Sequence, residues 1–346
     1  MGTVLVTGGA GFIGSHTSVQ LLKKGYDICI LDSFINSYEI TIKQIERIIK
    51  NNKSRTGNLF LKKGDLRNRR FLDEVFIEFR DNKSPFDGVI HFAGLKSVEE
   101  SVNQPLKYYD FNLNSTLCLL EAMKKFKCYS LVFSSSATIY DPNHKGKFKE
   151  NSNRNPINPY GNTKLIIEKI LEDLSVSSSA EWKIANLRYF NPVGAHESSL
   201  IGENPLIRPT NLFPIIMKVA KREYDYLSIF GNDWPTKDGT CIRDYIHVMD
   251  LADAHLASLD YLMSNKPQIV SINIGTGNGT SVMEIVKKFI QVTKIHIPFK
   301  FENRRKGDPA CLVADNSLSL ELLKWKPKRD LSDMCFHAWE WERHKQ

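Results

Sequence analysis

The stretch "TGGAGFIG", residues 7–14, contains three regularly spaced glycines, Gly8, Gly11 and Gly14. A run of β-branched residues that reads as a buried strand comes directly before it, and a helical pattern over 12–24 begins within it. In this position one glycine makes a tight turn, one lets the backbone approach a pyrophosphate, and one lets the helix pack on the strand. The helix N-terminus then offers N–H groups and the positive end of its dipole to the phosphates. The stretch therefore predicts a dinucleotide-binding turn.

Strand and helix patterns continue to alternate through the first half of the chain. Further strands are predicted over 27–32, 58–65, 86–94, 129–137 and 182–191, with helices over 105–127 and 159–175. Such alternation favours right-handed βαβ units and a parallel sheet covered on both faces. We therefore expect an α/β fold with a doubly wound, Rossmann-like parallel sheet. Because the alternation stops near residue 190, we divide the chain into a dinucleotide-binding domain, 1–188, and a smaller mixed α/β substrate domain, 189–346.

Two aspartates follow predicted strands and indicate which dinucleotide binds. Asp32 closes the second strand, where a carboxylate can accept hydrogen bonds from both ribose hydroxyls of NAD and would repel the 2′-phosphate of NADP. Asp65, in "GDLR", follows the third strand and is placed to meet the adenine, although a helix cap would look the same in the sequence. The expected cofactor is NAD.

Composition narrows the class of protein. The chain has 346 residues, a formal net charge of +8 and basic residues spread along its length, without the concentrated basic stripe expected of a nucleic-acid-binding protein. No apolar run is long enough for a membrane span. The six cysteines and nine histidines show no metal-ligand spacing, so no metal site is expected. Met1 leads directly into a strand without a leader pattern, and we expect a cytoplasmic protein with free thiols.

A set of hydroxyl and amine groups is expected at the carboxyl edge of the sheet. The fifth predicted strand ends in Ser134, Ser135 and Ser136, and the next helix begins with Tyr160 and Lys164, which share one helix face. A free tyrosine has a pKa of about 10, but a lysine ammonium and a nicotinamide cation both favour the phenolate and lower that pKa. We therefore predict that Tyr160 is a base, that Lys164 tunes it and holds the nicotinamide ribose, and that Ser136 shares the substrate proton.

These motifs together resemble those of a known family. The sequence is similar to UDP-glucose 4-epimerases, which are extended short-chain dehydrogenases/reductases, in "TGGAGFIG", "HFAGLKSV", "FSSSATIY", "NPYGNTK", "RYFNPVGAH" and "FGNDWPTKDGTCIRDYIHVMDLA". The resemblance implies interconversion of UDP-galactose and UDP-glucose through a 4-keto intermediate, by reversible hydride transfer to tightly bound NAD. It also implies that residues 189–346 bind the UDP-sugar and that the protein is a homodimer, paired through helices near 105–125 and 159–175.

The resemblance also assigns roles to individual residues. The expected NAD contacts are Gly8, Gly11, Phe12, Ile13, Gly14, Asp32, Asn36, Asp65, Leu66, Phe92, Ala93, Lys96, Asn112, Ser134, Tyr160, Lys164 and Tyr189. The expected UDP-hexose contacts are Lys96, Ser136, Tyr160, Phe190, Asn191, Asn211, Leu212, Phe230, Arg243, Tyr245, Arg305 and Asp308. Two arginines beside a diphosphate make electrostatic sense, because a planar guanidinium binds phosphate oxygens bidentately.

Two positions depart from the family pattern, and three rival interpretations stay open. Leu312 stands where related enzymes carry tyrosine or cysteine, which leaves acceptance of N-acetylated sugars open, and Phe111 replaces a polar residue, which makes Asn112 the expected contact. A 4,6-dehydratase needs an acid pair after the strand-five serine, whereas Ala137 and Thr138 follow it here. An epimerase that acts on UDP-xylose or UDP-glucuronate is harder to exclude from the sequence than a dehydratase. An inactive NAD-sensing scaffold would have little reason to keep the serine, tyrosine and lysine together.

Overall fold

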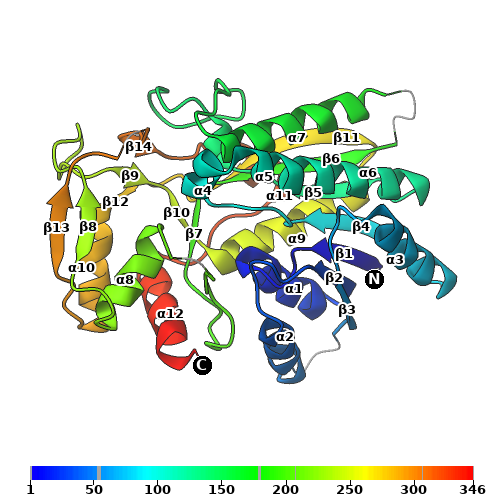
Figure 1. Cartoon of the computed structure of the whole chain (residues 1–346), viewed down its shortest axis with the longest axis horizontal. Helices are drawn as coiled ribbons and strands as arrows, with labels where there is room; N and C mark the ends of the chain where they lie inside the picture. The colour runs from blue at the N-terminus through cyan, green and yellow to red at the C-terminus, as the bar shows by residue number, and fades with distance from the viewer. Residues whose placement is uncertain (1, 53–55, 178–180, 207, 306, 346) are drawn as a thin grey trace.

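The centre of the molecule is a seven-stranded parallel sheet (Figure 1). The computed structural model describes residues 2–52, 56–177, 181–206, 208–305 and 307–345. In spatial order the strands are β11 (Gln268–Ile274), β6 (Lys183–Tyr189), β5 (Ser130–Ser134), β4 (Phe86–His91), β1 (Thr3–Thr7), β2 (Asp27–Asp32) and β3 (Leu59–Lys63). The order reverses between β1 and β4, and such a switch point is where doubly wound sheets bind ligands at the carboxyl ends of their strands. The predicted fold class is confirmed.

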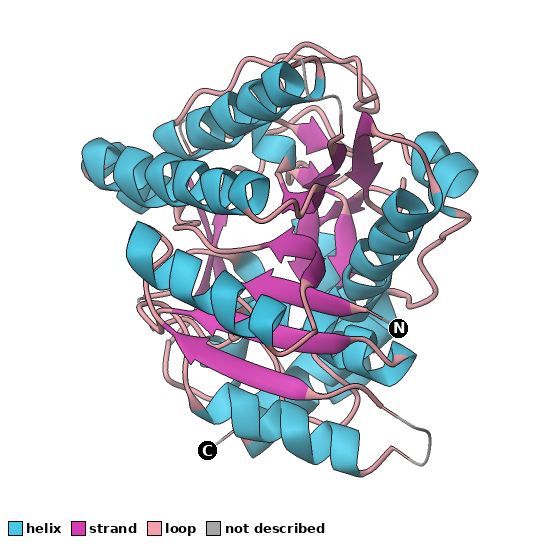
Figure 2. Cartoon of the chain, turned by 90° about the vertical axis from the view of Figure 1, so that its right-hand side faces the viewer, coloured by secondary structure: helices cyan, strands magenta, loops and turns pink. Residues whose placement is uncertain are grey.

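Helices cover both faces of this sheet, and Figure 2 shows them on either side of the strands. One face carries α1 (Phe12–Lys24), α2 (Ile40–Lys50), α9 (Val248–Ser264) and α11 (Ser317–Leu323). The other face carries α3 (Arg69–Asp81), α6 (Ser115–Lys125) and α7 (Pro159–Ser175), and the short helices α4 (Val98–Asn103) and α5 (Pro105–Tyr109) pack against α7. Each face has its own apolar core, because a central parallel strand buries side chains on both sides.

A second, smaller region packs at the carboxyl edge of the sheet and lies on the left of Figure 1. Its strands are β7 (Asn191–Val193), β8 (Leu227–Phe230), β9 (Ile242–Arg243), β10 (Tyr245–His247), β12 (Thr280–Ser281), β13 (Phe299–Glu302) and β14 (Cys311–Leu312). Its helices are α8 (Leu212–Ala220), α10 (Val282–Thr293) and α12 (Leu331–His344). These elements enclose a third apolar core around Ile216, Ile285 and Phe289.

The chain does not divide cleanly at residue 189. The helix α9 and the strand β11 come after that point, yet β11 pairs in parallel with β6 along its whole length and α9 packs on α1. Residues 248–274 thus return to the large sheet after the chain has begun the smaller region. The return pairs the outer N–H and C=O groups of β6 and makes β11 the edge strand on that side of the sheet.

The long helix expected over 105–127 is not one regular helix. It begins with Pro105 at the first turn of α5, passes through a π-helical turn over Asp110–Asn114, and continues as α6. A single π-turn inserts one extra residue into a helix and is frequent at functional sites. Here it turns Phe111 toward a large cavity and Asn112 into the interior.

Within the described ranges, none of the helices combines the length and apolar character needed to cross a bilayer. All six cysteines are free thiols, and four of them are buried. Among the described residues, no three His, Cys, Asp or Glu side chains are arranged to hold a metal ion.

Candidate active site

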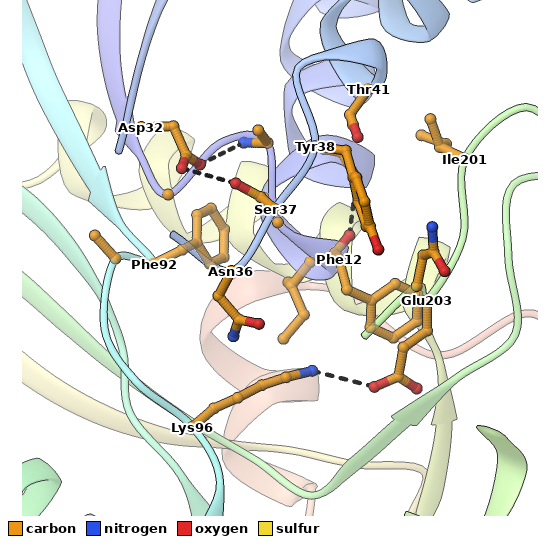
Figure 3. A pocket seen from close by; sticks show the side chains of 18 of the residues that line it. Phe12, Asp32, Asn36, Ser37, Tyr38, Thr41, Phe92, Lys96, Ile201 and Glu203 are labelled. Atoms are coloured by element: carbon orange, nitrogen blue, oxygen red, sulfur yellow. Dashed lines mark hydrogen bonds and ion pairs between the residues drawn. The ribbon is translucent and has the colours of Figure 1, made fainter. Parts of the chain in front are cut away.

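A cavity of about 550 Å³ opens at the switch point of the sheet (Figure 3). Its floor is the turn between β1 and α1, and its walls come from the ends of β2, β4 and β5 and from the start of α7. The loop over residues 198–205 and the end of α12 close the side facing the smaller region. The cavity thus joins the dinucleotide turn to the Tyr160 and Lys164 pair in one continuous space.

The glycine turn has no room for side chains where the sequence places glycine. Gly8 has a φ of +69°, which glycine adopts without strain. A Cβ on Gly14 would lie 2.3 Å from the Gly8 carbonyl oxygen, so α1 can pack on the turn only without a side chain there. Gly11 precedes the first residue of α1 and provides no side-chain cap, so the first N–H groups of the helix lie beside the cavity, which Phe12 and Ile13 also line. This cradle fits the pyrophosphate of a dinucleotide.

Asp32 is held beside the turn with both oxygens directed by hydrogen bonds. Its Oδ2 accepts from the Ala10 N–H at 3.0 Å, and its Oδ1 accepts from the Phe34 N–H and the Ser37 hydroxyl, each at 2.9 Å. Each carboxylate oxygen has further lone pairs for a ribose hydroxyl. Asn36 lies in the same loop and lines the cavity (Figure 3). The carboxylate is therefore fixed in place before any ligand binds.

We expect Asp32→Ala to weaken NAD binding and to reduce the discrimination against NADP. The substitution removes the acceptor for the ribose hydroxyls and the negative charge that would oppose a 2′-phosphate. Binding of each dinucleotide to the apo-protein, measured by calorimetry, should show a ratio that moves toward NADP by about tenfold, or 1.4 kcal/mol. Asp27→Ala is the control, since Asp27 lies at the other end of the same strand and its carboxylate accepts hydrogen bonds from Asn58, away from the cavity. An unchanged ratio in Asp32→Ala would remove this residue from the cofactor site.

Asp65 and Leu66 line the cavity beyond β3, and Asp65 is engaged by a neighbour. The Arg67 guanidinium bonds to Asp65 at 2.6 Å and lowers the pKa of that carboxyl. The same guanidinium lies 3.7 Å from the centre of the Phe111 ring. Phe111 therefore forms part of a wall with Arg67, a flat surface that the sequence did not predict. The predicted adenine contact of Asp65 stays a prediction.

The start of α7 fixes the position of Tyr160. Asn158 caps the helix by accepting from the Gly161 N–H at 2.8 Å, and Pro159 occupies the first turn, where its missing N–H costs nothing. Tyr160 is buried and shares a hydrogen bond with Ser136. One turn further, the Lys164 ammonium donates to the Ser134 carbonyl at 2.8 Å. The structure thus brings together the three residues predicted as the catalytic group.

The expected low pKa of Tyr160 depends on two positive charges, those of Lys164 and of the nicotinamide, and the chain itself supplies the first. Burial raises the pKa of Tyr160 above its usual value, and the Tyr189 phenol adds to the rise, whereas the hydrogen bond from Ser136 lowers it. Burial also lowers the pKa of Lys164 to about 8, against the opposing effect of the Glu168 carboxylate. The lysine alone therefore does not make the phenol acidic, because desolvation outweighs its charge. A further positive charge is needed beside the phenol.

Other predicted cofactor contacts surround the same space. Phe92 and Ala93 follow β4 and line the cavity, and the Ser134 hydroxyl donates to the Tyr189 phenol oxygen at 3.1 Å. Lys96 reaches across the opening and forms an ion pair with Glu203 at 3.1 Å (Figure 3). Glu203 belongs to the loop from the smaller region, so this pair joins the two sides of the cavity.

Asn112 lies behind the wall of the cavity. Its amide oxygen accepts from the Leu95 N–H at 2.8 Å, and its amide nitrogen donates to the Leu95 carbonyl and to the Thr163 hydroxyl. These bonds occupy the side chain and tie the Leu95 loop to α7. The structure places Asn112 where it supports the cavity wall.

The predicted UDP-hexose contacts fall into two groups in the smaller region. In the first group, Asn191 on β7 is paired with Tyr245 on β10, and the Asn191 amide oxygen is buried without a hydrogen-bond partner in the described part of the chain. Phe190 is buried just before β7, next to the end of β6. Such an orphaned acceptor fits a ligand hydroxyl or N–H group.

The second group supplies cationic side chains. Arg243 on β9 donates to the Pro309 carbonyl at 2.9 Å and lies 3.6 Å from the Asp308 carboxylate. Arg305 stacks on Phe230, with its guanidinium 4.2 Å from the ring centre. Asn211 precedes α8 without capping it, and Leu212 is the first residue of that helix. The side chains of Arg243 and Arg305 thus come from segments far apart in the sequence, and neither is locked in a buried ion pair.

Several cavity residues were missed from the sequence. Tyr38 and Thr41 approach the cavity from the loop after β2 and the start of α2, and Glu203 approaches it from the smaller region (Figure 3). Trp341, in α12, lines the same cavity. Trp341 holds the loop by donating to the Glu203 carbonyl at 3.2 Å. For Tyr38 and Thr41 the sequence offered one signal, because both follow closely after Asp32 along the chain. The others depend on how the smaller region docks.

Comparison with known proteins gives matches over almost the whole chain. A protein-family model described as GDP-mannose 4,6 dehydratase matches residues 5–337. The chain is 47% identical over 340 residues to a UDP-glucose 4-epimerase of Cyamopsis tetragonoloba, covering 98% of this chain and 94% of that protein.

Solved structures give the same result. A crystal structure of UDP-glucose 4-epimerase from Stenotrophomonas maltophila with bound NAD and formylated UDP-arabinopyranose has a TM-score of 0.93 and 42% identity, covering 99% of this chain and 98% of that one. The Bifidobacterium longum UDP-glucose 4-epimerase in complex with NAD+ and UDP has a TM-score of 0.91 and 42% identity, with the same coverage. The chain therefore belongs to the family that the dehydratase model describes and, within it, to the UDP-glucose 4-epimerases.

Proposed function

We propose that this enzyme interconverts UDP-galactose and UDP-glucose through a 4-keto intermediate, with NAD retained from one turnover to the next and Tyr160 as the base. The observation that carries the proposal is the meeting of Tyr160 and Lys164 at one end of a cavity whose other end is the glycine turn, with Ser136 hydrogen-bonded to Tyr160. When bound, NAD accepts a hydrogen with its electron pair from the sugar C4 and later returns it.

Residues of the chain itself transfer the proton and bind the cofactor. Tyr160 takes the proton of the sugar 4-hydroxyl at its phenol oxygen and gives it back, and Ser136 shares that proton through its hydrogen bond. Lys164 is fixed by the Ser134 carbonyl, where its charge favours the phenolate. The turn, Asp32 and Lys96 hold the cofactor.

The smaller region holds the nucleotide and leaves the sugar free to turn. Arg243 and Arg305 bind the diphosphate, and Asn191, Asn211 and Asp308 bind the remaining polar groups. Guanidinium groups suit this task because they offer paired donors to phosphate oxygens. Residues 1–188, together with the returning segment 248–274, form the NAD-binding part, and the rest of 189–346 forms the UDP-sugar part.

A dehydration mechanism has no support at this site. The positions after Ser136 hold Ala137, which is buried in an apolar cluster with Phe190, and Thr138, whose hydroxyl donates to Ser136 at 2.9 Å. Neither can deliver a proton to one sugar carbon while another residue removes one from its neighbour.

The test is conversion of UDP-galactose by purified enzyme without added NAD. We expect UDP-glucose to form, with no water lost and no net NADH, as read by nuclear magnetic resonance of the sugar. A need for stoichiometric external NAD, or a dehydrated product, would overturn the proposal. UDP-xylose and UDP-glucuronate are run beside it to rank the related epimerase activities.

We expect Leu312→Cys to increase turnover of UDP-N-acetylgalactosamine relative to UDP-galactose. Leu312 is half-buried at the register position opposite Arg243 and packs on the cluster that contains Phe190. A smaller side chain makes room for an acetamido group, and a difference of this size in a pocket changes selectivity by about tenfold or more. The neighbouring Cys311→Ser, on an exposed side chain, serves as the control. A ratio that stays constant in Leu312→Cys would show that this residue does not limit the sugar pocket.

The enzyme is proposed to be a cytoplasmic homodimer. Apolar side chains project from α4, α5 and α6, with Val102 at 60% and Leu106 at 83% exposure, beside α7. Covering them against a second copy would remove apolar surface from water. Analytical ultracentrifugation should give twice the chain mass, and Leu106→Glu should shift the distribution toward monomer.

A further inference from the structure

Glu168 is a fully buried carboxylate in α7, one turn beyond Lys164. Tyr160, Lys164 and Glu168 are spaced four residues apart, so they follow one another along a single face of the helix. A carboxylate is almost never buried unless it is paired. The partners of Glu168 therefore indicate what it does.

Three elements supply those partners. The Ser135 hydroxyl, at the end of β5, donates to Oε1 at 2.5 Å. Arg188 on β6 donates to Oε1 at 3.0 Å and to Oε2 at 2.6 Å, and Arg154, from the loop before α7, lies 3.5 Å from Oε2. Arg188 is itself held by the Tyr140 hydroxyl at 3.1 Å and the Glu150 carbonyl at 2.7 Å. The carboxylate is thus fixed rigidly between the helix and two strands.

The bond to Ser135 links Glu168 to the residue that lies next to Ser136 in the chain. Ser135 stands between Ser134, whose carbonyl accepts from Lys164, and Ser136, which bonds to Tyr160. A change in the backbone at Ser135 would move both neighbours. By holding this one hydroxyl, Glu168 sets the register between the end of β5 and the catalytic face of α7.

The charge of Glu168 also acts on Lys164. The ammonium also lies near the Tyr160 ring, near the Phe133 ring at 4.8 Å and near His91 on β4. Burial lowers the pKa of His91 to about 3, so the His91 ring is neutral. Burial lowers the pKa of Lys164 and Glu168 raises it. Glu168, one helical turn from Lys164, is thus the acidic neighbour whose charge opposes the effect of burial on the ammonium.

We propose that Glu168 is a positioning residue for the reaction: through Ser135 it fixes Ser134 and Ser136, and through its charge it keeps Lys164 an ammonium while Tyr160 works. This rests on the proposed function, in which Tyr160 is the base. A purely structural ion pair with Arg188 would stabilise the fold without acting on either catalytic residue.

The first test is the pH profile of Glu168→Gln, which removes the charge and keeps the side-chain shape. Because the Lys164 pKa is about 8 and Glu168 raises it, loss of the carboxylate lowers that pKa further. Lys164 then loses its proton at lower pH, and the alkaline limb of kcat should move down by about one pH unit, the lower end of what a neighbouring charge does. The KM for UDP-galactose and the amount of NAD bound to the purified enzyme should both equal those of the parent enzyme.

A second variant separates positioning from charge. Ser135→Ala keeps the carboxylate and removes the link to β5, so kcat should fall by about tenfold, or 1.4 kcal/mol, with the alkaline limb unmoved. Glu172→Gln is the matched control one turn further along α7, where the carboxylate is partly exposed and pairs with Arg154 at 2.7 Å. In this variant both kcat and the alkaline limb of its pH profile should equal those of the parent enzyme.

The outcomes separate this inference from the proposed function. A parental profile in Glu168→Gln, or parental kcat in Ser135→Ala, overturns the positioning role while leaving Tyr160 as the base. Where Glu168→Gln does not fold, the Ser135→Ala result decides alone. Ultraviolet difference spectra of ionised tyrosine, taken against Tyr160→Phe, give a readout independent of turnover: the Tyr160 phenolate should form at higher pH in Glu168→Gln. Full activity of Tyr160→Phe would instead overturn the proposed function.

Discussion

Tyr160→Phe should lower kcat by about 10³-fold, within the range that a positioned general base contributes. The substitution removes one oxygen atom from a buried ring that already packs with Leu95, Tyr108 and Phe111. Because the aromatic ring stays in place, the cavity keeps its shape and NAD should remain bound. Single-turnover and steady-state rates with UDP-galactose, together with the NAD content of the purified protein, measure both parts.

Tyr108→Phe is the matched control for this variant. Tyr108 is a buried tyrosine in the same cluster, but its hydroxyl bonds to Glu100 at 2.9 Å and to the Ser97 N–H at 3.0 Å, away from the cavity. Tyr108→Phe should lower the free energy of unfolding by about 1 kcal/mol, typical of one hydrogen bond, and leave kcat unchanged. A Tyr160→Phe enzyme with near-parental kcat would assign the proton transfer to another group.

The raised pKa of Tyr160 has a consequence for how this base is switched on. Burial favours the neutral phenol in the protein alone, and the ammonium does not overcome it. Bound oxidised cofactor adds a positive charge near the phenol, which favours the phenolate. Titration of tyrosine absorbance should therefore show Tyr160 ionising at lower pH in the NAD-bound protein than in the stripped protein.

Gly14→Ala should remove bound NAD and destabilise the fold. The added Cβ would meet the Gly8 carbonyl at 2.3 Å and the Gly9 Cα at 2.8 Å, and both are backbone atoms that cannot rotate away. Either α1 moves off the turn or the turn opens, and overpacking of this kind costs about 1–3 kcal/mol. Cofactor content after purification and the free energy of unfolding in urea are the two measurements.

Gly11→Ala provides a graded comparison in the same turn. Its Cβ would meet the Gly8 carbonyl at 3.3 Å, a contact that a shift of a few tenths of an ångström relieves. The loss of stability should be smaller than for Gly14→Ala. Equal effects at the two positions would show that the glycines are not needed for close packing.

The catalytic helix shows how far local sequence reaches. The helix predicted over 159–175 is α7, and the four-residue spacing predicts that Tyr160 and Lys164 share a face, which the structure has. Both depend only on capping and helical periodicity, so neighbouring residues determine them. The pKa of Tyr160 cannot be read from such a local pattern, because desolvation depends on everything packed around the ring.

The smaller region shows more clearly which contacts the local sequence does not predict. The segment 248–274 carries no local signal that it belongs to the large sheet, since its pairing with β6 is a contact between residues 85 positions apart, such as Asn186 and Ser271. In the same way, Glu203 and Trp341 join the cavity only when the smaller region docks on it. Long-range pairing of this kind is chosen by the free energy of the whole packed core.

From its sequence alone, this chain is determined to have a doubly wound sheet, a glycine turn after its first strand and a serine, tyrosine and lysine set near the sheet edge. Those features follow from hydrophobic periodicity, backbone freedom and helix spacing, which act over a few residues. Only the tertiary structure decided the return of β11, the burial that raises the Tyr160 pKa and the Glu168 network behind it. Burial and charge at a point in space depend on residues that the sequence keeps far apart.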